Sequence, residues 1–278
     1  MDTKQFVPAG HFYSSIPDLN DIRAKQSLLF NKNKRDIPGV NLREDYQIKL
    51  ISEKFIQYYA EQPWDNKISS LRYCSENSMY GYSDAIFLYC MLRNVRPARL
   101  IEVGSGYSSC VVLDTNDIFF DGNLECTFIE PHPDTLKGLL YADDFEKINI
   151  IQNKLQDVDV SLFSNLKEND ILLIDSTHVS KIGSDVNYLF FEILPKLSPG
   201  VFVHFHDIFY PFEYPAEWIF EGRQWQEDYL LRAFLQFNNM FEIVVWNDFL
   251  MQFNKSLIAE KMPICLNGGG ASLWIRHI

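Results

Sequence analysis

The sequence predicts a doubly wound α/β fold, in which helices flank a mostly parallel sheet of seven strands. From residue 100 onward, short apolar segments with strand character alternate with segments of helical periodicity. The first apolar segment runs directly into a glycine turn, as strands do where they meet helices in a parallel sheet. A glycine run precedes the last apolar segment, which indicates an antiparallel pair at one edge of the sheet.

The elements follow in order along the chain. Residues 1–45 carry scattered prolines, glycines and charges and are predicted as loop with short helical pieces, and helical spacing follows at 46–60 and 83–94. The predicted strands are 100–103, 126–130, 148–152, 171–175, 201–206, 241–246 and 272–276. Helices are predicted between them at 108–114, 133–140, 186–194 and 229–238, and a long loop ending in glycines 268–270 joins the last two strands. We expect an N-terminal extension, 1–80, and a main domain, 81–278.

Composition restricts the class of protein. The net charge of −12 disfavours a general nucleic-acid or anionic-membrane surface, and the 47% hydrophobic content is ample for a core. The chain has no apolar run long enough to cross a membrane and does not start like a secretory leader, so a cytoplasmic protein is expected. Five cysteines without C-x-x-C spacing are expected to be reduced thiols. Three aromatic residues in the extension, Phe6, Phe12 and Tyr13, favour a lid over a cleft or a contact within a homodimer.

The glycine turn after the first strand indicates a nucleotide-like cofactor. It contains Gly104 and Gly106 but has Ser109 where a dinucleotide-binding turn carries its third glycine. A cofactor without phosphates needs only close approach of the backbone, which two glycines allow. Glu102 adds a carboxylate that could pair with a cationic amino group. These features favour S-adenosylmethionine over a dinucleotide, with a plain structural turn as the alternative.

Two acidic residues after the next strands suit the rest of such a cofactor. Glu130 ends the second strand, 26 positions after Gly104, where an acidic residue accepts bonds from ribose hydroxyls. Its alternative role is to cap the turn at Pro131. Asp157 follows the third strand, where it could meet an adenine amino group or cap a helix.

The ends of the fourth and fifth strands carry candidate catalytic residues. Asp175 ends a strand of four apolar residues, and a buried carboxylate there needs a partner such as an amino group, a metal or a proton. His178 follows and could act as a general base. Strand periodicity places His206 toward the site, and Asp175, His206 and Asp207 could form a divalent metal site. The alternatives are histidines and a capping aspartate with structural roles only.

A loop with five aromatic residues and two prolines follows, at 208–218. It could form a stacking wall for a sugar or an aromatic acceptor. A hydrophobic subunit contact or a packed lid is an equally acceptable interpretation.

With these motifs in place, the chain resembles the class I S-adenosylmethionine-dependent methyltransferases, in particular a bacterial subgroup associated with glycan or secondary-metabolite genes. The resemblance runs from about residue 81 to the end and implies a Rossmann-like sheet, methyl transfer to a hydroxyl oxygen, and a small-molecule or glycan acceptor. Metal-dependent relatives have an acidic or amide ligand where this chain has His206, which puts the metal in doubt. The resemblance places the cofactor on Glu102, Gly104, Ser105, Gly106, Ser108, Glu130, Pro131, Asp157 and Asp175, and the chemistry on His178, His206 and Asp175.

Three other functions fit parts of the sequence. A nicotinamide-dependent oxidoreductase could use a related sheet, although the missing third glycine argues against it. A partner subunit without activity could retain the fold. A metal-dependent hydroxylase or hydrolase built on His204, His206 and Asp207 is the weakest alternative.

Overall fold

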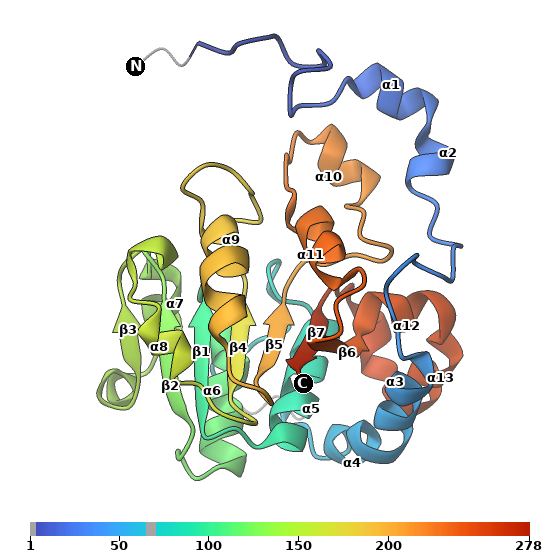
Figure 1. Cartoon of the computed structure of the whole chain (residues 1–278). Coiled ribbons are helices and arrows are strands. Elements are labelled where there is room, and N and C mark those ends of the chain that lie inside the picture. The colour runs from blue at the N-terminus through green and yellow to red at the C-terminus, as the bar shows by residue number, and fades with distance from the viewer. Residues whose placement is uncertain (1–3, 65–70) are drawn as a thin grey trace.

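A computed structural model describes residues 4–64 and 71–278, and its centre is a seven-stranded sheet (Figure 1). The strand order is β3-β2-β1-β4-β5-β7-β6. Strands β1 to β5 pair in parallel, whereas β7 lies antiparallel between β5 and β6. The predicted fold class is therefore confirmed, including the antiparallel C-terminal strands. The strands are β1 (Arg99–Val103), β2 (Glu125–Ile129), β3 (Asn149–Ile151), β4 (Ile171–Ile174), β5 (Phe202–Phe205), β6 (Phe241–Trp246) and β7 (Leu273–His277).

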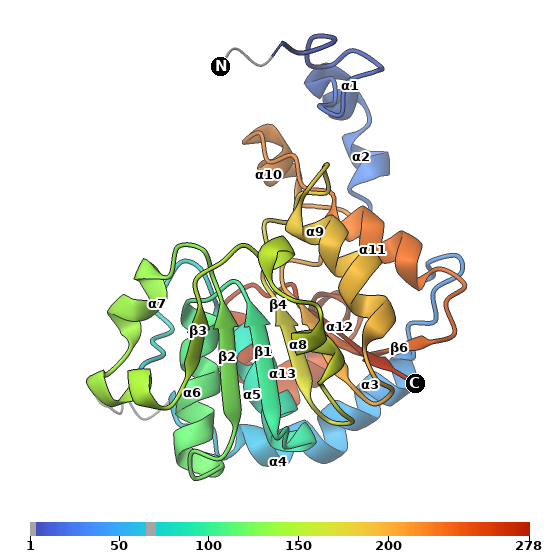
Figure 2. The same cartoon turned by 60° about the vertical axis from the view of Figure 1, so that its left-hand side comes forward.

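Helices cover both faces of the sheet. Helices α5 and α6 lie on one face, and α9 and α11 lie on the other (Figures 1 and 2). The longer helices are α3 (Glu44–Leu50), α5 (Tyr82–Val95), α6 (Tyr107–Phe119), α7 (Asp134–Leu139), α11 (Glu227–Leu235), α12 (Asn247–Phe253) and α13 (Lys255–Lys261). The short ones are α1 (Leu19–Ala24), α2 (Gln26–Leu29), α4 (Ile56–Tyr59), α8 (Ser161–Ser164), α9 (Asp185–Tyr188) and α10 (Ala216–Phe220). A π-helical turn at Ile51–Phe55 joins α3 to α4, and another at Leu189–Ile193 extends α9.

The helices predicted from periodicity are all present, but the prediction of a long loop between the last two strands was wrong. That segment contains α12, α13 and a 3-10 turn at Pro263–Asn267. Its buried residues, among them Phe249, Leu250 and Ile258, pack into the common core. Short helices of this kind have weak periodicity and are stabilised by tertiary packing, so the sequence pattern alone did not indicate them.

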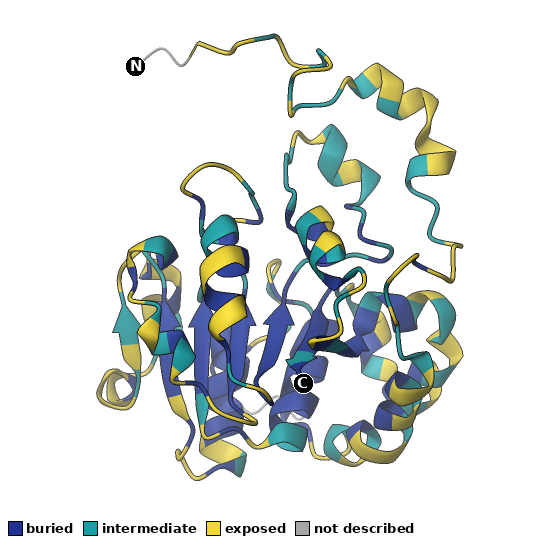
Figure 3. Ribbon diagram, in the orientation of Figure 1, coloured by how far each residue is buried: buried dark blue, intermediate teal, exposed yellow. Residues whose placement is uncertain are grey.

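The core occupies the two faces of the sheet and includes α5, in which every residue from Ser83 to Leu92 is buried (Figure 3). All four residues of β4 and all four of β5 are buried. Helices on both faces exclude water from these strands. Their sequences are therefore continuous apolar segments, without the alternation of apolar and polar residues that is typical of a half-exposed strand. Polar residues occur where the runs end, which places the chemistry at the carboxyl edge of the sheet.

The N-terminal residues fall into a buried segment and an exposed segment. Ile51 and Phe55 are completely buried, and Phe55 packs edge-on against Phe87 of α5, so this segment shares the main core. Helices α1 and α2 have no buried residue, and they lie apart from the sheet beyond α10 (Figures 1 and 2). The division of the chain at residue 80 stays a prediction.

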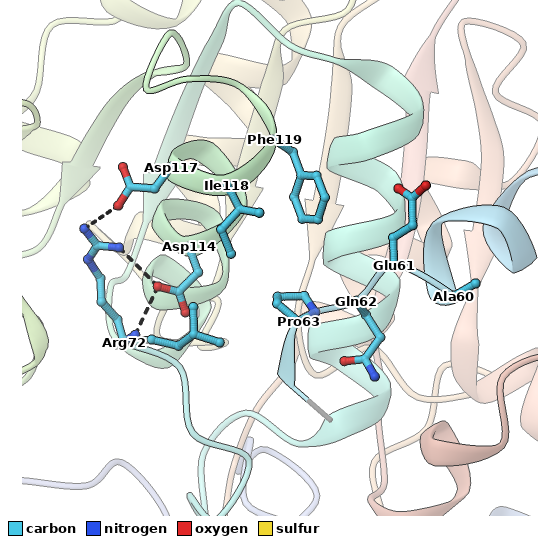
Figure 4. Close-up of a pocket in the computed structure, with 10 residues that line it drawn as sticks. Ala60, Glu61, Gln62, Pro63, Arg72, Asp114, Asp117, Ile118 and Phe119 are labelled. Atoms are coloured by element: carbon cyan, nitrogen blue, oxygen red, sulfur yellow. Dashed lines mark hydrogen bonds and ion pairs between the residues drawn. The ribbon is translucent and has the colours of Figure 1, made fainter. Parts of the chain in front are cut away.

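Arg72 ties the segment before α5 to the main domain (Figure 4). Its guanidinium bonds to Asp114 at 3.1 Å, to Asp117 at 2.8 Å and to Asp144 at 2.8 Å, and its backbone amide also donates to Asp114. The Arg72 side chain is 5% exposed. A buried cation with three carboxylate partners is costly to separate from any of them, so this network holds the segment in one position.

Gly104 allows the glycine turn to approach the end of β4. Its φ of +79° lies in the left-handed region, and a Cβ atom there would come within 1.8 Å of the carbonyl oxygen of Asp175. The two segments are also joined by a bond from the Asp175 amide to the carbonyl of Val103. Only glycine therefore permits this contact.

We expect Gly104→Ala to lower the free energy of unfolding by roughly 2–4 kcal/mol, because the methyl group adds both backbone strain and a steric clash. Gly138→Ala is the matched control, since a Cβ at this position of α7 meets nothing within 4 Å. The control should be neutral or slightly stabilising. Urea unfolding of the three proteins measures the difference, and equal midpoints would contradict the packing argument.

Candidate functional site

Four of the predicted residues meet at the carboxyl edge of the sheet, after β4 and β5. His178 Nε2 lies 3.5 Å from Asp175 Oδ1 and 3.8 Å from Asp207 Oδ2, and His206 Nε2 lies 3.5 Å from Asp207 Oδ1. His178 and Asp207 both have positive φ, 59° and 55°. Such backbone conformations are rare outside glycine and concentrate at functional sites. The structure therefore brings together Asp175, His178, His206 and Asp207, as the strand ends suggested.

His178 is held from several sides. Its Nδ1 atom lies 2.7 Å from Glu227 Oε2, and Glu227 is completely buried at the start of α11. Its carbonyl oxygen accepts from the amides of Gln226 and Glu227, at 2.9 and 3.2 Å. The ring packs at 4.4 Å against that of Trp225. With Nδ1 occupied by Glu227, Nε2 is the nitrogen that faces Asp175 and Asp207.

The charges in this cluster stabilise one another. Burial by itself would lower the pKa of His178, but its hydrogen bonds to Asp175 and Glu227 raise that pKa well above 6.5. Burial by itself would raise the pKa of Asp175, but His206 and the bond to His178 outweigh it, so the pKa of Asp175 is lowered. The resting cluster therefore contains a protonated imidazole paired with carboxylates.

His206 and Tyr80 present polar atoms with no protein partner among the described residues. These atoms are the His206 Nδ1 and the Tyr80 hydroxyl, and the two rings lie 5.0 Å apart. Both residues are at least 95% buried. Buried polar atoms are normally satisfied, so these two are available to a bound ligand. His204 is different: it lies in the core against Trp274, and burial lowers its pKa to about 3.

A cavity of about 380 Å³ opens at the glycine turn, and we call it the turn cavity. Its lining includes three residues of the turn, the strand-end cluster, and aromatic residues from flanking segments. Of the predicted cofactor residues, it is lined by Ser105, Gly106, Ser108 and Asp175. The turn itself is ordered by a bond from the Gly106 amide to Ser109 Oγ at 3.1 Å. The turn and the catalytic candidates thus face one space.

A second cavity of about 390 Å³ adjoins the first, and we call it the glycine-wall cavity. The two share Met79, His206 and Asp207 in their linings. Backbone of residues 268–270 forms one wall, and Phe209 and Trp218 of the aromatic loop contribute another. The other aromatic residues of that loop, Tyr210, Phe212 and Tyr214, are buried in the core.

Glu102 does not line the turn cavity. It is completely buried, and its two carboxylate oxygens accept bonds from Ser108 Oγ at 2.5 Å and Ser109 Oγ at 2.7 Å. Burial raises the pKa of Glu102 to about 8, against the lowering effect of the serine bonds. Its place in the structure is beneath the turn, where it fixes the start of α6.

The predicted ribose and adenine contacts, Glu130 and Asp157, are not among the residues that line the turn cavity. Glu130 follows β2, and one of its carboxylate oxygens accepts a hydrogen bond from the His132 amide at 2.8 Å. Glu130 therefore caps the turn at Pro131, which is the alternative role considered for it above. Asp157 is exposed in a 3-10 turn after β3. Their roles toward a cofactor stay predictions.

The donor arrangement does not fit the predicted metal site of Asp175, His206 and Asp207. Within residues 4–64 and 71–278, no group of three or more His, Cys, Asp or Glu side chains is arranged to hold a metal ion. The two aspartates instead contact the imidazole of His178, which is oriented by Glu227. The imidazole of His178 lies between the two carboxylates, with Nε2 3.5 Å from Asp175 Oδ1 and 3.8 Å from Asp207 Oδ2.

Sequence reasoning missed two residues of the site. Glu227 lies 49 positions after His178, and acidic residues are common in the first turn of any helix, so no local signal singled it out. Tyr80 lies in an irregular segment before α5, where an aromatic residue carries no distinctive pattern.

Among the residues that the structure describes, every helix is too short or too polar to span a membrane. The described cysteines are all free, as expected.

Comparison with known proteins gives two sequence matches. A family model described as "Methyltransferase domain" matches residues 101–208, which include the glycine turn, Asp175, His178 and Asp207. An uncharacterised protein of Archaeoglobus fulgidus is 31% identical over 174 residues, which cover 60% of this chain and 76% of that protein.

Solved structures with similar folds are more distant. A methyltransferase of Podospora anserina bound to S-adenosylhomocysteine is 13% identical, with a TM-score of 0.47 over 99% of this chain and 100% of that one. The O-methyltransferase TomG of Streptomyces achromogenes is 12% identical, with a TM-score of 0.46 over 94% and 96%. A Staphylococcus aureus protein described as a caffeoyl-CoA O-methyltransferase is 15% identical, with a TM-score of 0.44 over 85% and 100%. Scores of this size do not indicate an acceptor.

We expect Glu227→Gln to lower the pKa of His178 by about one unit or more, because it removes the carboxylate at 2.7 Å. NMR of histidine-labelled protein measures this pKa, and a His178→Gln variant assigns the signal. Glu221→Gln is the control, since Glu221 pairs with Arg223 and does not contact His178. If the histidine signals titrate identically in all three proteins, the proposed charge pairing is wrong.

Proposed function

The chain belongs to the class I S-adenosylmethionine-dependent methyltransferase family, and from that premise we propose that it transfers the methyl group of S-adenosylmethionine to a hydroxyl oxygen of a small molecule or sugar. The observation that carries the proposal is the placement of His178. Its Nε2 faces the turn cavity between Asp175 and Asp207, while Nδ1 is held by buried Glu227.

S-adenosylmethionine supplies the methyl group on a positively charged sulfur, so the protein must align the two reactants and accept one proton. The glycine turn, with Ser105 and Ser108, provides a surface for the methionine part, and Glu130 for the ribose. The free Tyr80 hydroxyl and His206 Nδ1 provide buried hydrogen-bonding groups beside them. Asp175 supplies a carboxylate close to His178.

His178 acts as the general base in this proposal. Its deprotonated Nε2 takes the proton of the acceptor hydroxyl as the oxygen attacks the methyl group, and Glu227 stabilises the imidazolium that results. The protonated resting state means that a proton must leave His178 before turnover. The second candidate base is His206, which also lines the turn cavity.

The alternatives are less well supported by the site. A nicotinamide-dependent oxidoreductase needs backbone amides for a pyrophosphate, whereas the turn keeps Ser109 at the third-glycine position and uses its hydroxyl to cap α6. A subunit without activity has no need for two strained residues and a buried ion cluster at one strand edge. A second copy of the chain stays a proposed partner, with the exposed Phe6, Phe12 and Tyr13 of the extension as its contact.

S-adenosylhomocysteine should raise the melting temperature by roughly 5–10 °C at about 100 times its Kd, since binding at that level stabilises the fold by about 2.7 kcal/mol. Glu130→Ala should abolish most of this shift, whereas Glu125→Ala, at the exposed start of β2, should preserve it. Differential scanning fluorimetry measures these melting temperatures. No shift in the wild-type protein would exclude the cofactor.

His178→Gln should reduce methyl transfer by roughly 10²–10⁴-fold and leave S-adenosylhomocysteine binding intact, because only proton transfer is lost. His132→Gln, an exposed histidine outside the cavity, is the control. Wild-type turnover should rise with pH through a pKa above 6.5, since the raised pKa of His178 must be passed before the base is available. Excess EDTA should leave turnover unchanged.

Two results would overturn these assignments. Normal turnover in His178→Gln together with a loss in His206→Gln would move the base to His206. Loss of activity in EDTA with recovery on adding a divalent cation would show that the strand-end carboxylates bind a metal after all.

A further inference from the structure

The glycine-wall cavity has a charge character that bears on the acceptor. Its acidic side chains are Asp84 and Asp207, its one histidine is His206, and no Lys or Arg of the described residues lines it. The turn cavity, which opens into it past the same His206 and Asp207, also has no Lys or Arg in its described lining. A cavity intended for a phosphate or a carboxylate normally contains Arg, Lys or a set of backbone amides.

The histidines do not compensate for this lack of cations. His206 Nε2 already faces Asp207 at 3.5 Å, and His178 is shared among Glu227, Asp175 and Asp207. Asp84 is 4% exposed and accepts from Asn247 Nδ2 at 2.8 Å. An anionic acceptor would therefore meet carboxylates without a free cation.

Two nearby cations touch the aromatic wall and are also neutralised. Lys32 Nζ lies 5.7 Å from the Phe209 ring but pairs with Asp248 at 2.8 Å. Arg223 stacks 4.0 Å from the Trp218 ring and pairs with Glu221 at 3.3 Å. Neither residue lines the glycine-wall cavity.

The remaining walls suit a ring with hydroxyl groups. Phe209 and Trp218 meet edge to face with ring centroids 5.0 Å apart, and both are half-buried. Asn267 offers an amide group, which bonds to hydroxyls in either direction. The Asn77 amide is already used within its own turn, where it donates to backbone carbonyls and accepts from backbone amides. Backbone forms the wall at 268–270 because side chains are absent there, and a Cβ at Gly269 would meet nothing within 4 Å.

We propose that the glycine-wall cavity binds the methyl acceptor and selects it by charge: a hydroxylated ring that is neutral or cationic enters, and one that carries a phosphate or carboxylate is rejected. This rests on the proposed function, because it assigns the acceptor side of the same site. The selection comes from Asp84 and Asp207, which face the cavity with no unpaired cation among the described residues beside them.

The test uses ring compounds with the same ring and reacting hydroxyl groups but with substituents of different charge, and the protein is saturated with S-adenosylhomocysteine. One series is dopamine, 4-methylcatechol and 3,4-dihydroxybenzoate, and the other is methyl glucoside and glucose 6-phosphate. Ligand-observed NMR measures their binding. In whichever series binds, the neutral or cationic member should bind about tenfold or more tightly than the anionic one, as expected for one unscreened charge near two carboxylates.

Gly269 offers a matched pair of variants, since its backbone has no positive φ and its Cβ position is open. Gly269→Lys adds a cation to the wall and should weaken or reverse the preference. Gly269→Gln adds a neutral side chain of similar length and should keep the preference, even if overall affinity falls.

Each outcome has a defined meaning. Equal or tighter binding of the anionic members, or the same preference in both Gly269 variants, would overturn the charge selection. Failure of every probe to bind while S-adenosylhomocysteine still raises the melting temperature would overturn the assignment of this cavity to a hydroxylated ring. Failure of S-adenosylhomocysteine itself to bind would instead refute the proposed function.

Discussion

The contact between Gly104 and the carbonyl oxygen of Asp175 sets the geometry of the whole site. It brings the turn after β1 against the end of β4, at a distance that a Cβ atom would not permit. The glycine turn and the residues from Asp175 to His178 are therefore parts of one rigid edge. Because both strands are buried on both faces, neither can shift to relieve a larger side chain.

On this edge, the charged side chains are buried, and they are stabilised by one another rather than by water. His178 is buried with a left-handed backbone, and it remains there because Glu227 and two aspartates satisfy its imidazole. The same pairing places the imidazole of His178 between the two aspartates that the strand ends suggested as metal ligands. A single buried carboxylate on α11 thus fixes the orientation of this imidazole.

Much of the fold was predictable, because strand and helix periods are local properties of the sequence. Strands β1 to β7 and the helices with clear apolar spacing were expected close to their observed bounds. The segment 247–267 was not, since α12 and α13 owe their stability to contacts with distant residues. The strand ends predicted that Asp175, His178, His206 and Asp207 lie together, and the structure places them at one edge, while their roles stay predictions. Glu227 and Tyr80 come from segments whose sequences carry no distinctive signal.

By itself, the sequence determined the family, the order of elements and the set of polar residues at the strand ends. These follow from periodicity, glycine position and motif spacing, which are local properties of the sequence. Only the tertiary structure decided how those residues are used. It buried Glu102 beneath the turn, paired His178 with Glu227, and divided the aromatic loop between the core and the glycine-wall cavity. These outcomes depend on burial and on partners far away in the chain, which no local pattern encodes.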